Sequence, residues 1–169
     1  ATLGKHTRKA NIEGAITHAE LKGYRYNDIL VNVSMDNNLY DGSLNIADPN
    51  INLTVAGEAV IENSIPTFDI QVEAHDIALD SLNLWHKYPG YRLSASIDAQ
   101  YSGKTFDDAT ALFTVSGLNF INDNPDATNL QLDHIDIEVD NATSPQHIAI
   151  NSDLIEGRVD GSYSVATLA

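Results

Sequence analysis

The chain has 169 residues, a mass of 18.4 kDa and a formal net charge of -15, with 24 acidic residues against 9 basic ones. Because phosphate binding needs lysine and arginine clusters, we expect no nucleic-acid partner and no electrostatic attachment to anionic membrane surfaces. There is no cysteine, and no apolar run approaches the roughly 20 residues of a transmembrane helix. The opening stretch ATLGKHTRKA has no signal-peptide pattern, so we expect the chain to be part of a longer protein.

Apolar and polar residues alternate along most of the chain, which predicts antiparallel strands with one apolar face. The first predicted strand begins at Ala10 and ends near Leu21. The second begins at Tyr24, and its apolar positions change from even to odd numbers around Asn27 and Asp28. A β-bulge is the usual way to make such a change, so we expect one there.

The clearest alternation is FDIQVEA, at residues 68–74. It leads into DIALDSLNLWHKYPG, where the spacing of Leu79, Leu82 and Trp85 is typical of helix rather than strand. We therefore expect one short helical turn near residues 77–86, ended by the proline-glycine pair that follows. Alternation then resumes and continues to the end of the chain.

Two segments, 24–62 and 130–163, share an order of alternating strands around an acidic-glycine pair. The pair is Asp41-Gly42 in the first segment and Glu156-Gly157 in the second. This predicts a repeated hairpin unit inside a single β-rich domain that spans residues 1–169. The predicted fold is all-β, a curled antiparallel sheet of about ten strands.

A resemblance to a known family rests on the order of these motifs. The run GYRYNDILVNVSMDNNLYDGSLNIADPNINLTVAGEAV, followed by IPTFDIQVEAHDIALDSLNLW, resembles the repeats of the TamB family. These are the translocation and assembly module proteins of diderm bacteria, and the chain is most similar to Bacteroidetes members. The resemblance extends from about residue 23 to residue 163. It is carried by the strand alternation, the D-G or E-G turn, D-P-N before a strand, and F-x-I-x-V leading into the leucine-rich stretch.

The resemblance implies a β-taco, a long sheet that curls around an apolar groove. It implies a periplasmic segment of a protein anchored in the inner membrane. The implied role is outer-membrane biogenesis, through phospholipid transfer and through protein secretion or assembly with an Omp85-type outer-membrane barrel. Phospholipid acyl chains would lie in the groove. No enzyme activity, catalytic residue or cofactor is implied.

The residues expected to line this groove are the apolar members of the alternating positions. They are Ile29, Val31, Val33, Leu44, Leu53, Val55, Phe68, Ile70, Val72, Leu93, Ile97, Phe113, Ile135, Ile137, Ile148, Ile150, Ile155 and Val159. Periodicity fits a sealed sandwich core equally well, so the alternative is an extracellular β-sandwich adhesion or binding module. The terminal strands, near residues 10–16 and 155–163, would leave unpaired edges, and we expect self-association through them.

Other kinds of site have weaker support in the sequence. The six histidines lack the paired short spacings of a zinc site, so no metal centre is expected. The acidic positions from Asp133 to Asp140 alternate with isoleucine and valine, which is typical of the wet face of a strand. The loop Asp123–Asp126 is interpreted as a polar loop, with calcium binding as the less favoured alternative. There is no G-x-S-x-G motif, and no catalytic residue is expected.

Overall fold

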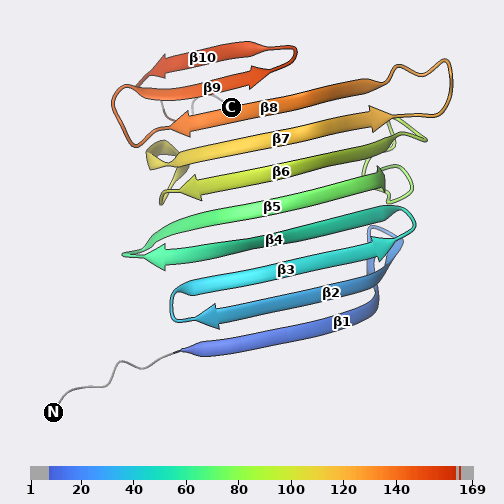
Figure 1. The fold of residues 1–169 in the computed structure, drawn as a ribbon, viewed down its shortest axis with the longest axis horizontal. Coiled ribbons are helices and arrows are strands. Elements are labelled where there is room, and N and C mark those ends of the chain that lie inside the picture. Colours follow the sequence, from blue (N-terminus) through green and yellow to red (C-terminus); the bar gives the residue numbers. More distant parts are fainter. Residues whose placement is uncertain (1–7, 163, 165–169) are drawn as a thin grey trace.

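The computed structural model describes residues 8–162 and 164. Ten strands form one antiparallel sheet in which each strand pairs with its neighbours in sequence (Figure 1). The strands are β1 (Lys9–Leu21), β2 (Tyr24–Asp36), β3 (Leu39–Asp48), β4 (Ile51–Glu62), β5 (Ile65–Ala78), β6 (Arg92–Ser102), β7 (Thr110–Ile121), β8 (Leu130–Asp140), β9 (Gln146–Ser152) and β10 (Glu156–Gly161). A short 3-10 helix, η1 (Phe106–Asp108), precedes β7. The all-β prediction is confirmed, and the sheet is open, with β1 and β10 at its edges.

The alternation in the sequence becomes two chemically different faces. Ile97 of β6, for example, lies opposite Val72 of β5 and Val115 of β7. Its neighbour Asp98 lies opposite Gln71 and Thr114. Because directly opposite residues in antiparallel strands share a face, the first set belongs to an apolar face and the second to a polar face. The described residues form no second sheet against either face.

The end of the β1–β2 hairpin, residues 17–28, leaves the plane of the sheet. β3 pairs with β2 only from Ile29 onward, so the hairpin end extends beyond it. The predicted bulge is absent, because Ile16–Ile29 and His18–Asn27 keep one register. Asp28 instead adopts φ +50°, a left-handed conformation that aspartate tolerates better than most residues. Because of this conformation, the even-numbered Tyr26 and the odd-numbered Ile29, on either side of Asp28, both face the core.

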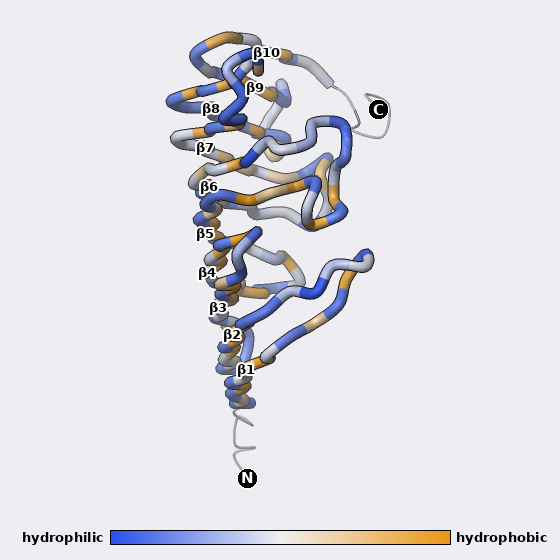
Figure 2. Tube along the Cα trace, turned by 90° about the vertical axis from the view of Figure 1, so that its right-hand side faces the viewer, coloured by the Kyte–Doolittle hydropathy of each residue, from blue (hydrophilic) through white to orange (hydrophobic). Residues whose placement is uncertain are grey.

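The hairpin end folds over one end of the apolar face and encloses a small core. Figure 2 shows it together with the other long connections, all on one side of the sheet. The buried core residues come from the sheet and from the segments that fold over it: Tyr26, Ile29, Ile46, Ile51, Ala74, Ile77 and Leu82. Leu82 belongs to the β5–β6 loop, residues 79–91. Next to it, Asn83 Nδ2 donates a hydrogen bond to the Lys22 carbonyl (3.1 Å), so the loop and the hairpin tip are in contact.

The β5–β6 loop begins with hydrogen-bonded turns where the helical turn was predicted. The Leu82 N–H donates to the Ala78 carbonyl (3.0 Å), which makes a single turn of helical type without a helix. The 3-10 helix lies elsewhere, at η1. Among the described residues, no helix has the length and apolar composition needed to span a bilayer.

The two predicted repeat units correspond to three consecutive strands each. Residues 24–62 contain β2, β3 and β4, and residues 130–163 contain β8, β9 and β10. Tyr163, at the end of the second unit, lies outside the described residues. The internal repeat stays a prediction.

Candidate functional site

The apolar face consists of rows of side chains that cross the sheet from strand to strand. One row, read along directly opposite positions, is Ile12, Val33, Gly42, Gly57, Ile70, Ala99, Phe113, Ile137, Ile150 and Gly157. The next is Ala10, Met35, Tyr40, Ala59, Phe68, Tyr101, Ala111, Val139, Ile148 and Val159. Neither row contains a charged residue. With strands about 4.8 Å apart, each row gives an uncharged path of roughly 40 Å.

Two shorter rows lie between these and the covered end of the sheet. One is Gly14, Val31, Leu44, Val55, Val72, Ile97, Val115 and Ile135. The other is Ile16, Ile29, Ile46, Leu53, Ala74 and Ala95, which meets the hairpin end. Four adjacent apolar rows therefore form a band that runs perpendicular to the strands.

Most of this band is open. Ile12 and Val159, at the two edges of the sheet, are 62% and 53% exposed. Val55 and Val72, in the middle, are half-buried by their neighbours within the sheet. Burial becomes deep only at the end covered by the hairpin, as at Ile29. The face is thus an exposed floor with a wall along one side.

The structure places nearly all of the predicted groove residues in these four rows. Leu93 lies opposite Ile77, past a register shift between β5 and β6, and packs against the core under the β5–β6 loop. Ile155 lies in the β9–β10 turn, where its carbonyl accepts a hydrogen bond from the Ser152 N–H (2.8 Å). These two positions are at the margin of the apolar band.

Sequence reasoning left out several members of the rows. Ile12, Met35, Tyr40, Tyr101 and Val139 all belong to the band. Met35, Tyr40, Tyr101 and Val139 have the same numerical parity as residues that were chosen on their own strands, so strict alternation would have found them. No residue of β1 was chosen, and Ile12 is found by its position opposite Val33. The glycines of the band follow the same alternation, as Gly42 does with Leu44, and the register shows that they lie in its rows.

Two of these glycines make a notch in the apolar floor. Gly42 and Gly57 lie directly opposite each other, and the hollow around them has a volume of about 230 Å³. The surrounding side chains include Val33, Phe68 and Ile70. A methyl group on Gly57 would lie 2.4 Å from the Asp69 carbonyl oxygen, whereas one on Gly42 would have only ordinary contacts at 3.5 Å and beyond.

A buried carboxylate holds the wall in place. Asp48, 7% exposed at the β3–β4 turn, accepts hydrogen bonds from the Tyr24 hydroxyl and the Asn50 N–H (3.0 Å) on Oδ1. Its Oδ2 accepts from the backbone N–H (3.1 Å) and the side-chain amide (2.7 Å) of Asn27. Burial alone would raise the pKa of Asp48, but these hydrogen bonds outweigh it and hold the pKa below its ordinary value.

The same arrangement affects the two tyrosines of the hairpin end. The Tyr24 and Tyr26 rings meet edge to face, with centroids 4.9 Å apart. Burial and the neighbouring Asp48 carboxylate raise the pKa of both phenols above their ordinary value. Both therefore stay neutral at physiological pH, which suits their position over an apolar core.

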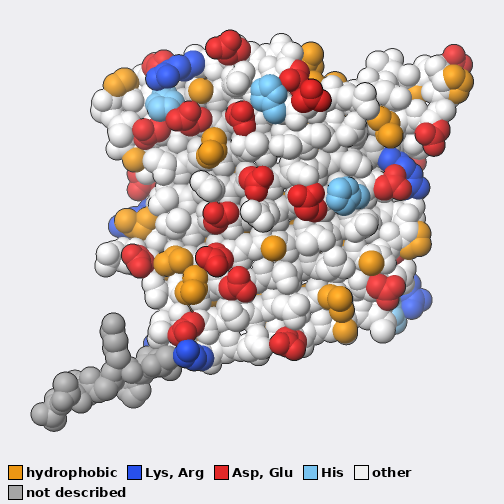
Figure 3. All heavy atoms as spheres, in the orientation of Figure 1, with side chains coloured by type: hydrophobic (Ala, Val, Ile, Leu, Met, Phe, Trp, Pro, Cys, Tyr) orange, Lys and Arg blue, Asp and Glu red, His pale blue; other side chains and the backbone are white. Residues whose placement is uncertain are grey.

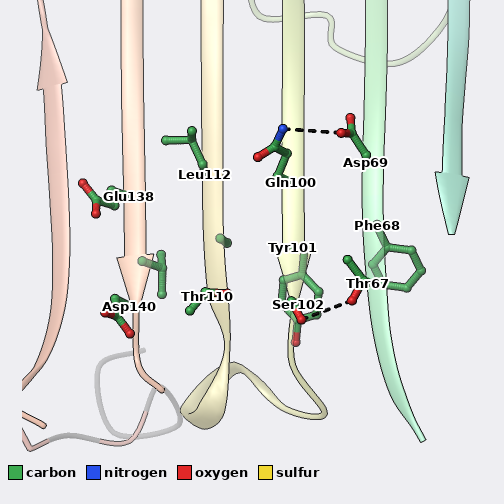
Figure 4. A pocket seen from close by; sticks show the side chains of 12 residues that line it. Thr67, Phe68, Asp69, Gln100, Tyr101, Ser102, Thr110, Leu112, Glu138 and Asp140 are labelled. Carbon is green, nitrogen blue, oxygen red and sulfur yellow. Dashed lines mark hydrogen bonds between the residues drawn. The ribbon is translucent and has the colours of Figure 1, made fainter. Parts of the chain in front are cut away.

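The polar face is strongly acidic, as Figure 3 shows. Asp41, Glu58 and Asp69 lie directly opposite one another on β3, β4 and β5. A shallow hollow of about 680 Å³ crosses β5 to β8 on this face, lined by side chains such as Gln100 and Leu112 (Figure 4). It is larger than the hollow at Gly42 and Gly57. Its hydroxyl, amide and carboxylate side chains belong to the polar face, but its lining also includes Phe68, Tyr101, Ala111 and Val139 of the second apolar row.

The predicted wet face of β8 is confirmed from Asp136 to Asp140, since Asp136 and Glu138 lie opposite Thr114 and Leu112 on the polar face. Within the described part of the chain, no three histidine or carboxylate groups lie close enough together to hold a metal ion. In the loop that follows β7, which the sequence offered as a calcium site at residues 123–126, the side-chain oxygen of Asn124 accepts a hydrogen bond from the Asp126 N–H (3.0 Å).

Comparisons with known proteins do not identify the chain. No family model, no curated protein and no solved structure matches it. Its resemblance to TamB repeats therefore stays a prediction from the sequence motifs.

Proposed function

We propose that this chain is a segment of a TamB-like, periplasm-spanning protein whose apolar face accommodates phospholipid acyl chains during their transfer to the outer membrane. The observation that carries this proposal is the band of uncharged rows across an open sheet. Soluble monomers seldom expose a continuous apolar surface of this extent unless it is functional. The order of motifs in the sequence supports the same assignment.

The chemistry of the band suits a conduit. Each buried methylene contributes about 0.8 kcal/mol, so partial burial of an acyl chain already gives useful affinity. The two longest rows carry no cationic side chain that would hold a headgroup in one place. Binding without a fixed headgroup site lets the cargo move along the rows.

The wider context belongs to the same proposal. A protein of this kind would be anchored in the inner membrane of a diderm bacterium, extend through the periplasm, and act with an Omp85-type barrel in outer-membrane biogenesis and protein assembly. The competing adhesion module requires a β-sandwich, and the described residues form a single sheet.

Mass spectrometry of organic extracts from the purified chain is the first test. We expect co-purifying phospholipid, because no second sheet among the described residues covers the band. A preparation that contains no lipid and takes up none from labelled phospholipid would contradict the proposal.

A substitution within the band makes the test specific. Val72→Asp places a carboxylate in the centre of the floor, and we expect crosslinking to a phospholipid with a photoreactive acyl chain to fall about tenfold, since charged groups are poorly accommodated beside hydrocarbon. Because Val72 is half-buried, the variant should stay folded. Gln71→Asp, on the adjacent residue of the polar face, is the matched control and should crosslink normally. A folded Val72→Asp variant with unchanged crosslinking would show that β5 does not contact lipid.

A further inference from the structure

The tip of the β5–β6 loop carries a cluster of aromatic rings. The Trp85 ring stacks on Phe120 of β7, with centroids 6.0 Å apart and planes at 20°. Tyr88 meets both rings edge to face, at 5.0 Å from Trp85 and 5.6 Å from Phe120. Tyr91 stacks on the Phe120 ring at 4.5 Å. The four rings form one block that joins the loop to the sheet.

Hydrogen bonds fix the base of this loop. Asp80 Oδ2 accepts the Gly90 N–H (2.8 Å), which closes the loop, and that bond lowers the pKa of the Asp80 carboxyl. Asn122 Nδ2 donates to the Pro89 carbonyl (3.1 Å), and the Tyr91 hydroxyl donates to the Thr128 carbonyl (3.0 Å). The loop tip is therefore held in a defined position next to the covered end of the apolar face.

The side chains at the tip are apolar and exposed. Leu84 is 40% exposed and Trp85 is 46% exposed, whereas Leu82 on the same loop is fully buried. Both lie on the same loop that forms part of the wall of the apolar band. A loop that is held by hydrogen bonds at its base and presents leucine and tryptophan to solvent has the features of a contact surface.

The loop tip also differs in charge from the rest of the molecule. Residues 84–92 contain Lys87, Arg92 and His86 but no aspartate or glutamate, in a chain whose net charge is -15. Arg92 is paired with Asp76 (2.9 Å). Lys87 Nζ lies 5.2 Å from the Tyr88 ring centre and forms no ion pair among the described residues.

We propose that the loop tip, residues 84–88, docks onto the surface of a phospholipid bilayer. Leu84 and Trp85 enter the interfacial region, where tryptophan is enriched because its ring is apolar and its N–H is polar. The Lys87 ammonium reaches the headgroup phosphates, and its methylene stem stays along the apolar surface. The charge of the loop is complementary to phosphate, while the acidic polar face is directed away from it.

This contact is distinct from acyl-chain binding in the rows, because it uses a loop and a bilayer surface instead of the sheet and a single lipid.

The acidic character of the whole chain determines the lipid charge of the membrane to which the loop tip binds best. Repulsion from anionic lipids acts over about 8 Å at physiological ionic strength, so a zwitterionic bilayer is the best partner. A soluble glycan is less suitable, because one face of the Trp85 indole already lies against Phe120 and the neighbouring Leu84 offers no hydrogen bonds.

Intrinsic fluorescence tests the proposal, since Trp85 is the chain's one tryptophan. On titration with phosphatidylcholine vesicles, we expect a blue shift of the emission and quenching by brominated lipids labelled near the headgroup end of the acyl chain. Leu84→Ser should weaken vesicle binding by about tenfold, the effect of losing one buried leucyl side chain. Lys87→Glu should weaken it further by repelling the phosphates.

Phe106→Ser is the matched control. Phe106 is 64% exposed, but it lies in η1 between Thr105 and two aspartates and should not affect vesicle binding. Circular dichroism checks that each variant keeps its β structure. The proposal is overturned if emission does not shift with vesicles, if Leu84→Ser binds as tightly as the parent chain, or if soluble glycans shift the emission and vesicles do not. A Val72→Asp variant that no longer crosslinks lipid but still binds vesicles would separate the two activities.

Discussion

The Asp48 carboxylate bonds the wall of the apolar face to the sheet. All four groups that contact its carboxylate are hydrogen-bond donors, from Tyr24, Asn27 and Asn50. They join the hairpin end to the β3–β4 turn. A buried charge without partners would be costly, whereas this one has both oxygens occupied, and the carboxylate form is favoured.

Asp48→Asn should therefore destabilise the chain by about 1–3 kcal/mol, because one acceptor oxygen becomes an NH₂ group that faces donors. Urea unfolding at neutral pH measures this. Asp41→Asn is the control, since Asp41 is exposed opposite Glu58 and loses only a like-charge neighbour. Its stability should be unchanged or slightly higher.

The pH dependence follows from the direction of the Asp48 pKa. The folded-state pKa lies below the unfolded value of about 3.9, so the stabilisation is fully present above that value and is lost as pH falls through the folded pKa. Parent and Asp48→Asn stabilities should therefore approach each other in strong acid. A difference that stays constant from pH 7 down to pH 2 would contradict this role.

At the level of the strands, β4 and β5 approach each other closely at Gly57. A Cβ atom there would lie 2.4 Å from the Asp69 carbonyl oxygen and 2.9 Å from the Ile70 Cα, both parts of the backbone. Backbone atoms cannot rotate away as a side chain can. The absence of a side chain at this position is thus a condition for regular pairing between the two strands.

Gly57→Ala should cost about 1–3 kcal/mol in the free energy of unfolding, because the two strands must separate locally. Gly42→Ala, directly opposite, should be neutral or stabilising by up to about 1 kcal/mol, since alanine restricts the unfolded chain more than glycine does. Thermal denaturation of both variants compares the two effects. Equal stabilities would show that the close approach at Gly57 is not maintained.

At the level of the whole molecule, the two edges of the open sheet are different. Among the described residues, the 13-residue strand β1 has no strand on its outer side, whereas the exposed edge of β10 is only 6 residues long and carries the Arg158–Asp160 ion pair (2.7 Å). A long edge strand with unpaired N–H and C=O groups recruits other strands. The β1 edge is therefore the place where we expect another strand to add.

The isolated chain should self-associate as its concentration rises, and sedimentation velocity over a concentration series measures this. Ile12→Lys, on β1, should weaken the association because a charge at an edge opposes pairing with a second copy. Val159→Lys, at the β10 edge, should have less effect. A chain that is monomeric at every concentration, or one that responds only to the β10 change, would contradict the expectation.

The sequence by itself determined the strands and the face on which most of their side chains lie, because a strand's side chains alternate with a period of two. It placed nearly all of the predicted groove residues on the apolar band, although other members of the band, such as Met35 and Val139, were not chosen. It located the Asp48-Pro49-Asn50 turn but did not indicate that Asp48 would hold the hairpin end. The fold-over of residues 17–28 depends on the conformation of Asp28 and on contacts with a loop about 60 positions away, at Asn83. Alternation is also the same for an open face and for a sealed core. Only the tertiary structure decided between them, since coverage of a face depends on where distant segments pack.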